Sequence, residues 1–322
     1  MDLNILIGGK AGQGLKTTAE ILGKTFHRMN YNIFTTKNYM SRVRGGHNFI
    51  KIRFGDREIT GPQANIDILV ALNKETVNLH YQDLDENGVT VTGTDIDNDI
   101  LNNNQLEAIP AKVIAREINI KGLNTVYIGA VLKLLGLKMK ECEKVITEYF
   151  SKEKIITDNI KLLKKGYQTA DTKFNLDQQL EQTEQTNNSN DNDLYINGND
   201  AVGLGALAAG VKIYTAYPMS PATGILNYIA GKQEQLGIAV EQAESEIGAI
   251  NMAIGASYGG VRAMTGTSGG GLALMAEGMG LAGITETPLV IAEVQRPGPA
   301  TGLPTRTEQG DLLFTVNISQ GE

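Results

Sequence analysis

A polar stretch near the middle of the chain divides it into two blocks, and each block must build its own core. Residues 177–193 hold a single apolar residue, Leu180, among many Gln and Asn residues. A segment of this composition cannot bury enough apolar surface to offset its conformational entropy. The pattern therefore predicts a flexible polar linker over 173–193, between a first domain at 1–172 and a second domain at 194–322.

The first block alternates short apolar runs with amphipathic stretches. An apolar strand at 3–7 leads into a glycine-rich turn at 8–14, and a helix follows to Met29 with apolar residues at helical spacing. We also expect strands at 32–36, 49–54, 66–72 and 89–92, and helices at 124–135 and 141–150. This alternation predicts an α/β domain with a largely parallel sheet.

The second block is also of α/β type. We expect a helix from an Asn199 cap to Gly210, helices at 222–233, 245–257, 272–280 and from about Glu308, and strands at 212–216, 239–241, 262–265 and 289–294. Ligands of such sheets lie at the carboxyl ends of the strands, so the loops after Ala216, Thr265 and Val294 are the places to look. No later element completes the sheet, and the second domain is expected to be incomplete.

Composition excludes several classes of function. The net charge of −7 argues against general nucleic-acid binding, which needs a basic face. Cys142 is the single cysteine, so this chain alone forms neither a disulfide nor a cysteine-ligated iron–sulfur cluster. His27, His47 and His80 lack metal-ligand spacing, and no metal site is predicted. No signal peptide or membrane-spanning run is present, which predicts a cytoplasmic protein.

Tyr217-Pro218-Met219-Ser220-Pro221 stands between a predicted strand and a predicted helix. Its two prolines fix the backbone, and Ser220 with the helix start can donate hydrogen bonds to an anion. A rigid turn in which Ser220 only caps the helix explains the same residues.

Glu246 is the last of three acids before an apolar helix. Acids complement a helix dipole from its first turn, which is one account of this residue. The alternative is that Glu246 points inward, where a buried carboxylate needs a partner. Local sequence leaves both open.

Two later segments are rich in glycine or proline. Thr265-Gly266-Thr267-Ser268-Gly269-Gly270-Gly271 follows a strand and opens a helix, so its backbone must pass close to a ligand or to another chain. Residues 295–312 form a long irregular segment with two arginines, Arg296 and Arg306. An ordered loop of this length is more often functional than a solvated connection.

In this order and spacing, the four segments resemble the pyrimidine-binding domain of the 2-oxoacid:ferredoxin oxidoreductases. YPMSP is similar to the family's Tyr-Pro-Ile-Thr-Pro signature, ESEIGA to its Glu-Ser-Glu helix start, and TSGGG to its Thr-Ser-Gly-Pro-Gly. ATGLPTRTEQGDL, within the fourth segment, matches most closely. In the first block, residues 8–14 and 41–47 resemble the family's γ domain.

The resemblance implies roles for particular residues. Glu246 corresponds to the glutamate that hydrogen-bonds the pyrimidine of thiamine diphosphate and takes part in catalysis. Tyr217, Ser220 and Arg306 are implied to bind the 2-oxoacid. Arg44, Gly45 and Gly46 are implied to contact coenzyme A, although a structural loop is the alternative for those three.

The resemblance also implies what another chain must supply. No Gly-Asp-Gly segment that would hold Mg²⁺ and diphosphate is present, and no cysteine cluster. A β subunit is expected to carry Mg²⁺ and the iron–sulfur cluster, with ferredoxin as the electron acceptor, and the chain alone should be inactive.

Two other functions stay open at this stage. One is a non-catalytic or truncated assembly subunit. The other is a nicotinamide-binding oxidoreductase based on the turn at 8–14, although the acid expected at the end of the second strand is missing from Thr35-Thr36-Lys37-Asn38.

Overall fold

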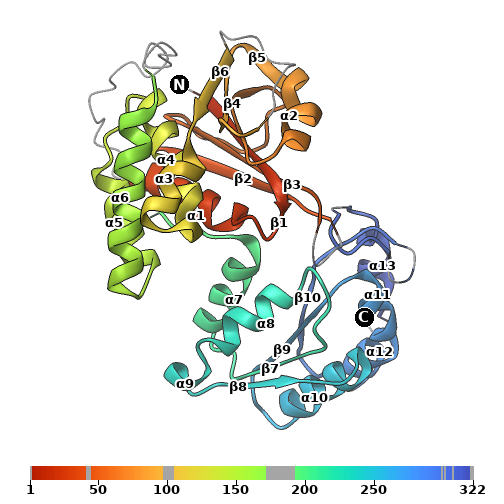
Figure 1. The fold of residues 1–322 in the computed structure, drawn as a ribbon. Helices are drawn as coiled ribbons and strands as arrows, with labels where there is room; N and C mark the ends of the chain where they lie inside the picture. The colour runs from red at the N-terminus through yellow and green to blue at the C-terminus, as the bar shows by residue number, and fades with distance from the viewer. Residues whose placement is uncertain are drawn as a thin grey trace. The chain divides into compact units, whose positions relative to one another are not determined.

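The computed structural model describes residues 2–40, 45–96, 105–171, 193–298, 300, 302–306 and 308–319. The chain folds into two compact units, Met1–Tyr195 and Ile196–Glu322, and each is described by itself (Figure 1). Both units are of the predicted α/β class. Within the described residues, no helix is both long enough and apolar enough to cross a bilayer.

The first unit is built on a six-stranded sheet in the order β2-β3-β1-β4-β5-β6. Its strands are β1 (Asp2–Ala11), β2 (Asn32–Asn38), β3 (Gly45–Gly55), β4 (Ile66–Ala71), β5 (Leu84–Gly93) and β6 (Leu106–Ile109). Its helices are α1 (Leu15–Arg28), α2 (Lys74–His80), α3 (Ala111–Ile118), α4 (Leu123–Leu134), α5 (Lys140–Tyr149) and α6 (Glu153–Thr169), with 3₁₀ turns η1 (Tyr81–Asp83) and η3 (Ile120–Gly122).

This sheet is mixed, and the expectation of a largely parallel sheet was wrong for one half of it. β3 runs antiparallel to both β1 and β2, whereas β1, β4, β5 and β6 pair in parallel. No described helix lies between β2 and β3, and antiparallel neighbours need no helical crossover. The strand after α1 is therefore separated from β1 by β3, unlike a dinucleotide-binding fold, which argues against the nicotinamide alternative.

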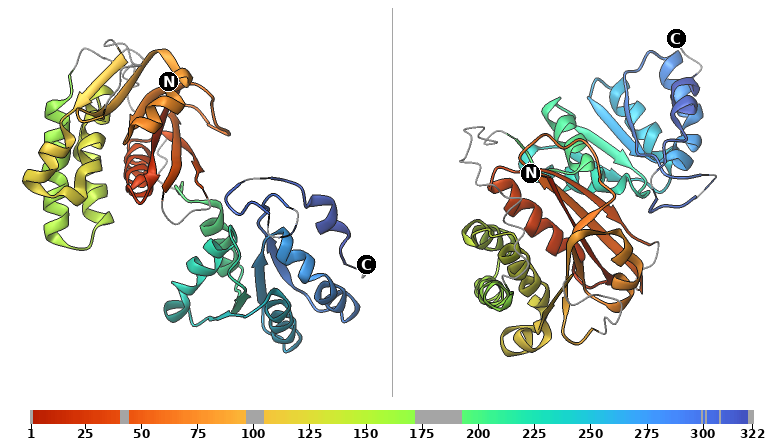
Figure 2. Two further views of the ribbon diagram at one scale, coloured as in Figure 1. Left: turned by 45° about the vertical axis from the view of Figure 1, so that its right-hand side comes forward. Right: turned by 90° about the horizontal axis from the view of Figure 1, so that it is seen from above.

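Alternation along β1 divides the core of the first unit between the two faces of the sheet. Leu3, Ile5 and Ile7 pack into the large cluster formed with α1, α4, α5 and α6, whereas Leu6 packs with Ile66, Leu69 and Val77 near α2. This is the period of two that a strand covered on both faces requires. Figure 2 shows the same layers from two further directions.

The second unit has a four-stranded sheet in the order β10-β9-β7-β8, with every pairing parallel. Its strands are β7 (Ile213–Ala216), β8 (Ala239–Gln242), β9 (Ala263–Thr267) and β10 (Val290–Glu293). Its helices are α7 (Gly198–Ala208), α8 (Thr223–Ala230), α9 (Gln233–Leu236), α10 (Glu246–Tyr258), α11 (Gly269–Leu274), α12 (Ala276–Ile284) and α13 (Leu312–Asn317).

Successive residues of β7 point to opposite faces of this sheet. Tyr214 and Ala216 pack with α8, and the Thr215 hydroxyl donates to the Ala249 carbonyl of α10 at 2.7 Å. The sequence placed the cap of α7 at Asn199, but it is Asn197, whose side chain accepts from the Asp200 amide. Asn199 instead donates to the Pro221 carbonyl at 2.9 Å, which braces the turn at the end of β7.

Tyr195 belongs to the first unit although it follows the polar stretch in sequence. Its hydroxyl lies 2.8 Å from the Thr35 hydroxyl of β2, and its ring packs against Gly23 of α1. A β-carbon at Gly23 would lie 2.5 Å from the Tyr195 hydroxyl oxygen, so the glycine leaves room for the ring. The second unit begins at the next residue.

Candidate functional site

The candidate site lies where the parallel strands of the second unit end. β7, β9 and β10 lead at their carboxyl ends into the turn at 217–221, the glycine-rich turn at 268–271 and the segment from Val294 onward. All three loops that the sequence singled out therefore lie along one edge of the sheet, where ligands of α/β sheets are bound.

The turn after β7 presents two side chains to the outside. Tyr217 and Ser220 are both exposed, and the Ser220–Pro221 peptide is cis. The Met219 carbonyl accepts from the Thr223 amide at 3.2 Å, so the backbone passes directly into α8. Ser220 is thus held in a fixed turn with its side chain accessible.

A buried arginine links this turn to β10. Arg296 is 6% exposed, and its Nη1 donates to the Ser220 carbonyl at 2.7 Å. Its Nε is buried and makes no hydrogen bond within the described part of the chain. The sequence analysis named Arg296 only as part of a long segment and assigned substrate binding to Arg306. Its position in the loop that begins at the end of β10, three residues after Glu293, is the signal that could have identified it.

Glu246 points inward, which decides between the two accounts of this residue. It is the first residue of α10 and only 4% exposed, while Ser245 caps the helix by accepting from the Gly248 amide at 3.1 Å. Glu246 Oε1 is buried without a hydrogen-bond partner among the described residues. A buried carboxylate oxygen in this state is costly unless a donor arrives from outside.

The glycine-rich turn is shaped around this glutamate. A β-carbon at Gly271 would lie 2.8 Å from Glu246 Cγ and 2.9 Å from its Oε1, so only a glycine fits there. Ser268 is fully buried, and its Oγ also lacks a partner in the described ranges. The side chains therefore offer a buried carboxyl oxygen and a buried hydroxyl, both of which can hydrogen-bond a polar ligand.

The segment after β10 carries two further polar groups. Glu293 is the last residue of β10, and burial, followed by the charge of Asp311, raises the pKa of Glu293 to about 7. Arg306 is partly buried, and its amide donates to the Leu303 carbonyl at 3.1 Å. In the same segment, the Arg296 guanidinium contacts the turn at Ser220 through its hydrogen bond to the Ser220 carbonyl.

In the first unit, strand pairing brings together two glycine motifs far apart in sequence. β1 and β3 pair Lys10 with His47 and Ala11 with Gly45, with a register shift between Lys10 and Ala11. Gly46 has a φ of 73°, which favours glycine. Arg44 lies outside the described residues.

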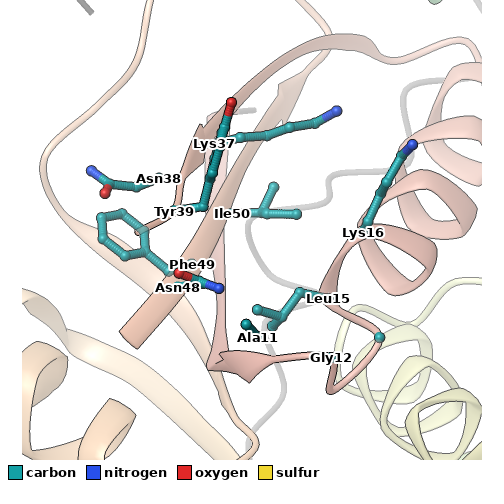
Figure 3. A pocket seen from close by; sticks show the side chains of 11 residues that line it. Ala11, Gly12, Leu15, Lys16, Lys37, Asn38, Tyr39, Asn48, Phe49 and Ile50 are labelled. Carbon is teal, nitrogen blue, oxygen red and sulfur yellow. The ribbon is translucent and has the colours of Figure 1, made fainter. Parts of the chain in front are cut away.

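A pocket of about 580 Å³ opens beside these motifs. Figure 3 shows Lys16 of α1 and Lys37 of β2 with their amino groups on the same side of the pocket. α1 begins after Gly14, and among the described contacts no side chain caps that end. Its first amides and the two lysines make this a suitable place for a phosphate-bearing ligand. The other lining residues are Ala11, Gly12, Gly14, Leu15, Asn38, Tyr39, Asn48, Phe49 and Ile50.

A histidine pair lies close to the same motifs. His47 Nε2 is 2.9 Å from His80 Nε2, and His80 Nδ1 is 3.1 Å from Asp83 Oδ2. Both histidines are buried. Burial, and then the neighbouring His80, lower the pKa of His47. The pair joins the start of β3 to the end of α2.

The chain consists of two α/β units with glycine-rich turns at strand ends, and comparison with known proteins identifies the family. The profile "Pyruvate ferredoxin/flavodoxin oxidoreductase" matches residues 4–169, and "Pyruvate flavodoxin/ferredoxin oxidoreductase, thiamine diP-bdg" matches residues 204–320. The chain belongs to the 2-oxoacid:ferredoxin oxidoreductase α-subunit family, as the sequence resemblance predicted.

Individual relatives agree. The α subunit of a 2-oxoacid:ferredoxin oxidoreductase from a Sulfolobus species is 32% identical over 378 residues, covering 100% of this chain and 58% of the relative. The 2-oxoglutarate synthase subunit KorA of Methanothermobacter marburgensis is 46% identical over 128 residues, covering 40% and 34%.

Among solved structures, 2-oxoglutarate:ferredoxin oxidoreductase from Magnetococcus marinus, with 2-oxoglutarate, coenzyme A and succinyl-CoA bound, is similar with a TM-score of 0.85 and 28% identity. That match covers 99% of this chain and 57% of the other. The chain therefore spans somewhat more than half the length of these full-length matches.

Proposed function

We propose that this chain is the part of a thiamine-diphosphate-dependent 2-oxoacid:ferredoxin oxidoreductase that holds the pyrimidine of the cofactor. The reaction is the oxidative decarboxylation of a 2-oxoacid to an acyl-CoA, with electrons passed to ferredoxin. The observation that carries the proposal is the buried Glu246 Oε1, which finds no donor among the described residues and lies beside the glycine-rich turn.

Glu246 would hold a proton in a hydrogen bond to a ring nitrogen of the pyrimidine. Thiamine diphosphate, when bound, would supply the nucleophilic carbon for decarboxylation of the 2-oxoacid, and Glu246 would hold its pyrimidine ring. Burial of Glu246 keeps water away from this hydrogen bond, and Ser245 caps α10 so that the glutamate is free for this role. The fully buried Ser268 hydroxyl is a second group that would orient the ring.

The 2-oxoacid carboxylate is expected to bind beside Ser220. The accessible Ser220 hydroxyl can donate to it, and Tyr217 is exposed on the same turn. Arg296 is already fixed to the Ser220 backbone, and guanidinium groups suit carboxylates because they donate in a planar fork. Arg306 remains a proposed second contact from the same segment.

Coenzyme A is proposed to bind on the first unit. The pocket near Lys16 and Lys37 suits its phosphates, and Gly45 and Gly46 lie at the paired end of β1 and β3. Arg44, directly before them in sequence, is proposed to contribute a further positive charge.

A second chain is proposed to complete the site. α10 exposes Ile247, Met252 and Tyr258 at 52%, 48% and 78%, and Ile247 directly follows Glu246. An apolar face of this kind beside a polar site suits a protein partner. We propose a β subunit that supplies the diphosphate and Mg²⁺ site and the iron–sulfur cluster.

The test is the exchange of Glu246 for Gln in the assembled enzyme. The variant should keep the helix and subunits intact, because Gln is nearly isosteric, but it cannot share a proton with the ring nitrogen. We expect turnover to fall roughly 10²–10⁴-fold. Deuterium exchange at the reactive thiazolium carbon, followed by NMR, should slow in parallel.

Glu244→Gln is the matched control, since Glu244 is exposed two residues earlier. If Glu246 only complements the helix dipole, its variant should lose about 0.3–1 kcal/mol of stability and keep its turnover. An unchanged exchange rate would remove Glu246 from the mechanism.

A further inference from the structure

Three aromatic rings pack together near the start of β3, on the face of the sheet that α2 covers. The ring centroids of His47 and Phe49 lie 5.6 Å apart, those of Phe49 and His80 4.8 Å, and those of the two histidines 5.0 Å. Gly8 of β1 leaves room for this cluster, because a β-carbon there would lie 3.2 Å from His47 Cε1. Rings packed this closely cannot move independently of one another.

Phe49 connects this cluster to the pocket beside Lys16 and Lys37. It forms part of the pocket wall, as Figure 3 shows. Phe49 follows His47 by two residues on β3, so both side chains leave the strand on the same face. A contact that holds His47 in place therefore also supports the ring of Phe49 at the pocket.

The hydrogen bonds of the histidine pair define where its hydrogens lie. The ionised Asp83 carboxyl can only accept, so His80 Nδ1, at 3.1 Å from Asp83 Oδ2, carries a hydrogen. A neutral His80 then has a bare Nε2, which accepts from His47 Nε2 at 2.9 Å. His47 Nδ1 is left bare, and it is buried with no partner among the described residues. The two neutral rings thus have opposite tautomers.

An added proton disturbs this arrangement wherever it binds. On His80 Nε2 it would leave two N–H groups facing each other across 2.9 Å. On His47 Nδ1 it would create a buried donor that has no acceptor in the described part of the chain. A second proton would add the repulsion of two positive rings 5.0 Å apart.

The surrounding charges do not reverse this preference. Burial, and then His80, lower the pKa of His47, and the opposing effect of Glu75 is smaller. His47 therefore takes up a proton only below its ordinary value of about 6.5. The titratable groups on the neighbouring elements are Lys10 on β1, Lys37 on β2, Lys74, Glu75 and His80 on α2, and Tyr81 and Asp83 on η1.

We propose that the His47–His80 pair is a pH-sensitive latch that holds Phe49 in the pocket wall and releases it on acidification. While both rings are neutral, their hydrogen bond ties β3 to α2. As the pH falls below about 6.5 and His47 takes up a proton, this contact weakens and the wall loosens. The latch does not depend on what the pocket binds, whereas its effect on coenzyme A rests on the proposed function.

Hydrogen–deuterium exchange of the full chain at pH 8 and pH 5.5, corrected for the intrinsic rate, tests the latch without a ligand. We expect peptides covering 45–51 and 76–83 to exchange roughly 2–10-fold faster at pH 5.5, the factor that corresponds to one hydrogen bond. In His80→Gln the amide oxygen can accept from His47 in either state, so the ratio should fall toward one. His27→Gln, on α1, is the control and should behave like the wild type.

A second measurement locates the hydrogens directly. The chain has three histidines, so ¹⁵N-histidine labelling of the full chain gives a spectrum of few resonances. At pH 8 the hydrogen of His80 should lie on Nδ1 and that of His47 on Nε2. The same tautomer on both rings, or equal exchange of the wild type at the two pH values, would overturn the latch.

Calorimetric titration with coenzyme A links the latch to the pocket. Coenzyme A should bind the wild type more weakly at pH 5.5 than at pH 8, and this weakening should be smaller in His80→Gln. The phosphates of the probe titrate alike with both proteins, so the difference between the proteins is the measure. Equal weakening would refute control of the pocket by the pair. If coenzyme A binds neither protein while exchange and tautomers behave as expected, the proposed coenzyme A site fails and the latch stands.

Discussion

Glu246 packs so closely against Gly271 that a β-carbon at position 271 would lie 2.8 Å from Glu246 Cγ, and it would also lie 2.0 Å from Thr267 Oγ1. The helices that hold Glu246 and Gly271, α10 and α11, follow different strands, β8 and β9. The glycine at position 271 is therefore needed to leave room for the Glu246 side chain, whether or not a ligand is bound. Any change at Gly271 should be felt at Glu246 Oε1.

Gly271→Ala is expected to displace the Glu246 carboxyl. Its β-carbon would lie 2.0 Å from Thr267 Oγ1, 2.8 Å from Glu246 Cγ and 2.9 Å from the Glu246 carboxyl oxygen Oε1, closer than real contacts, so both side chains must move. Overpacking of this kind costs about 1–3 kcal/mol. We expect weaker binding of thiamine diphosphate to the assembled enzyme, measured by calorimetry. Gly280→Ala is the control, since no described heavy atom lies within 4 Å of its β-carbon, and it should stabilise α12 by up to about 1 kcal/mol.

Arg296→Lys should raise the KM for the 2-oxoacid. Lysine keeps the charge but cannot reach Ser220 and the substrate with a planar fork. A hydrogen bond to a charged group contributes about 1.5–3 kcal/mol, so the KM should rise roughly tenfold or more while the KM for coenzyme A stays the same. Arg306→Lys tests the second proposed contact. Arg262→Lys, at the amino end of β9, is the control. An unchanged KM in Arg296→Lys would contradict this assignment.

Cys142 should be nearly inert to thiol reagents in the folded chain. It is fully buried, and burial raises the pKa of its thiol to about 12. The reactive thiolate is then a fraction on the order of 10⁻⁴ at pH 8, before access is considered. We expect labelling at least about 10³-fold slower than in denaturant. Because Cys142 is the only cysteine, its labelling reports unfolding of the first unit. Rapid labelling without denaturant would show that α5 opens readily.

The first unit should lose stability as the solution is acidified below pH 6.5. Burial and His80 lower the pKa of His47, while Glu75 opposes them. The unfolded state then binds a proton that the folded state rejects, so stability is complete above the ordinary histidine pKa of about 6.5 and falls as pH drops toward the folded value. Cys142 labelling at fixed denaturant, divided by the labelling rate of the fully denatured chain at the same pH to correct for the thiolate fraction, should accelerate over this range. His47→Gln should show a weaker dependence, and an identical one would rule out His47 as the cause.

Local sequence was enough to place most strands of both units and the loops that form the candidate site. The loops at the ends of β7, β9 and β10 follow from period and composition alone, whereas the strand predicted at 3–7 runs on to Ala11 as β1, so the turn predicted at 8–14 was wrong for residues 8–11 and is confined to 12–14. α2, α3, α6 and β6 were not expected. β6 is short, and α6 interleaves charged and apolar residues that only its packing on α4 arranges into faces.

What the sequence could not show depends on contacts between distant segments. The burial of Glu246 was an open question because local physics allowed either direction. Arg296 was passed over because its partner, the Ser220 carbonyl, lies in a turn 76 residues earlier. The pairing of β3 with β1 likewise depends on the whole sheet. Strand ends and glycine turns can be recognised from local sequence. Which distant side chain packs against them, such as Arg296 at the Ser220 turn, cannot.

Tyr195 packs against α1 and β2, so a fragment made to express the first unit alone should include this residue. A fragment that stops after Asp171 leaves the hydroxyl of Thr35 and the hollow at Gly23 without the ring that fills them. A fragment that extends through Tyr195 keeps the aromatic ring that fills this space. A cut within the polar stretch therefore removes a half-buried aromatic side chain from the first unit and leaves Tyr195 on the fragment that carries the second unit.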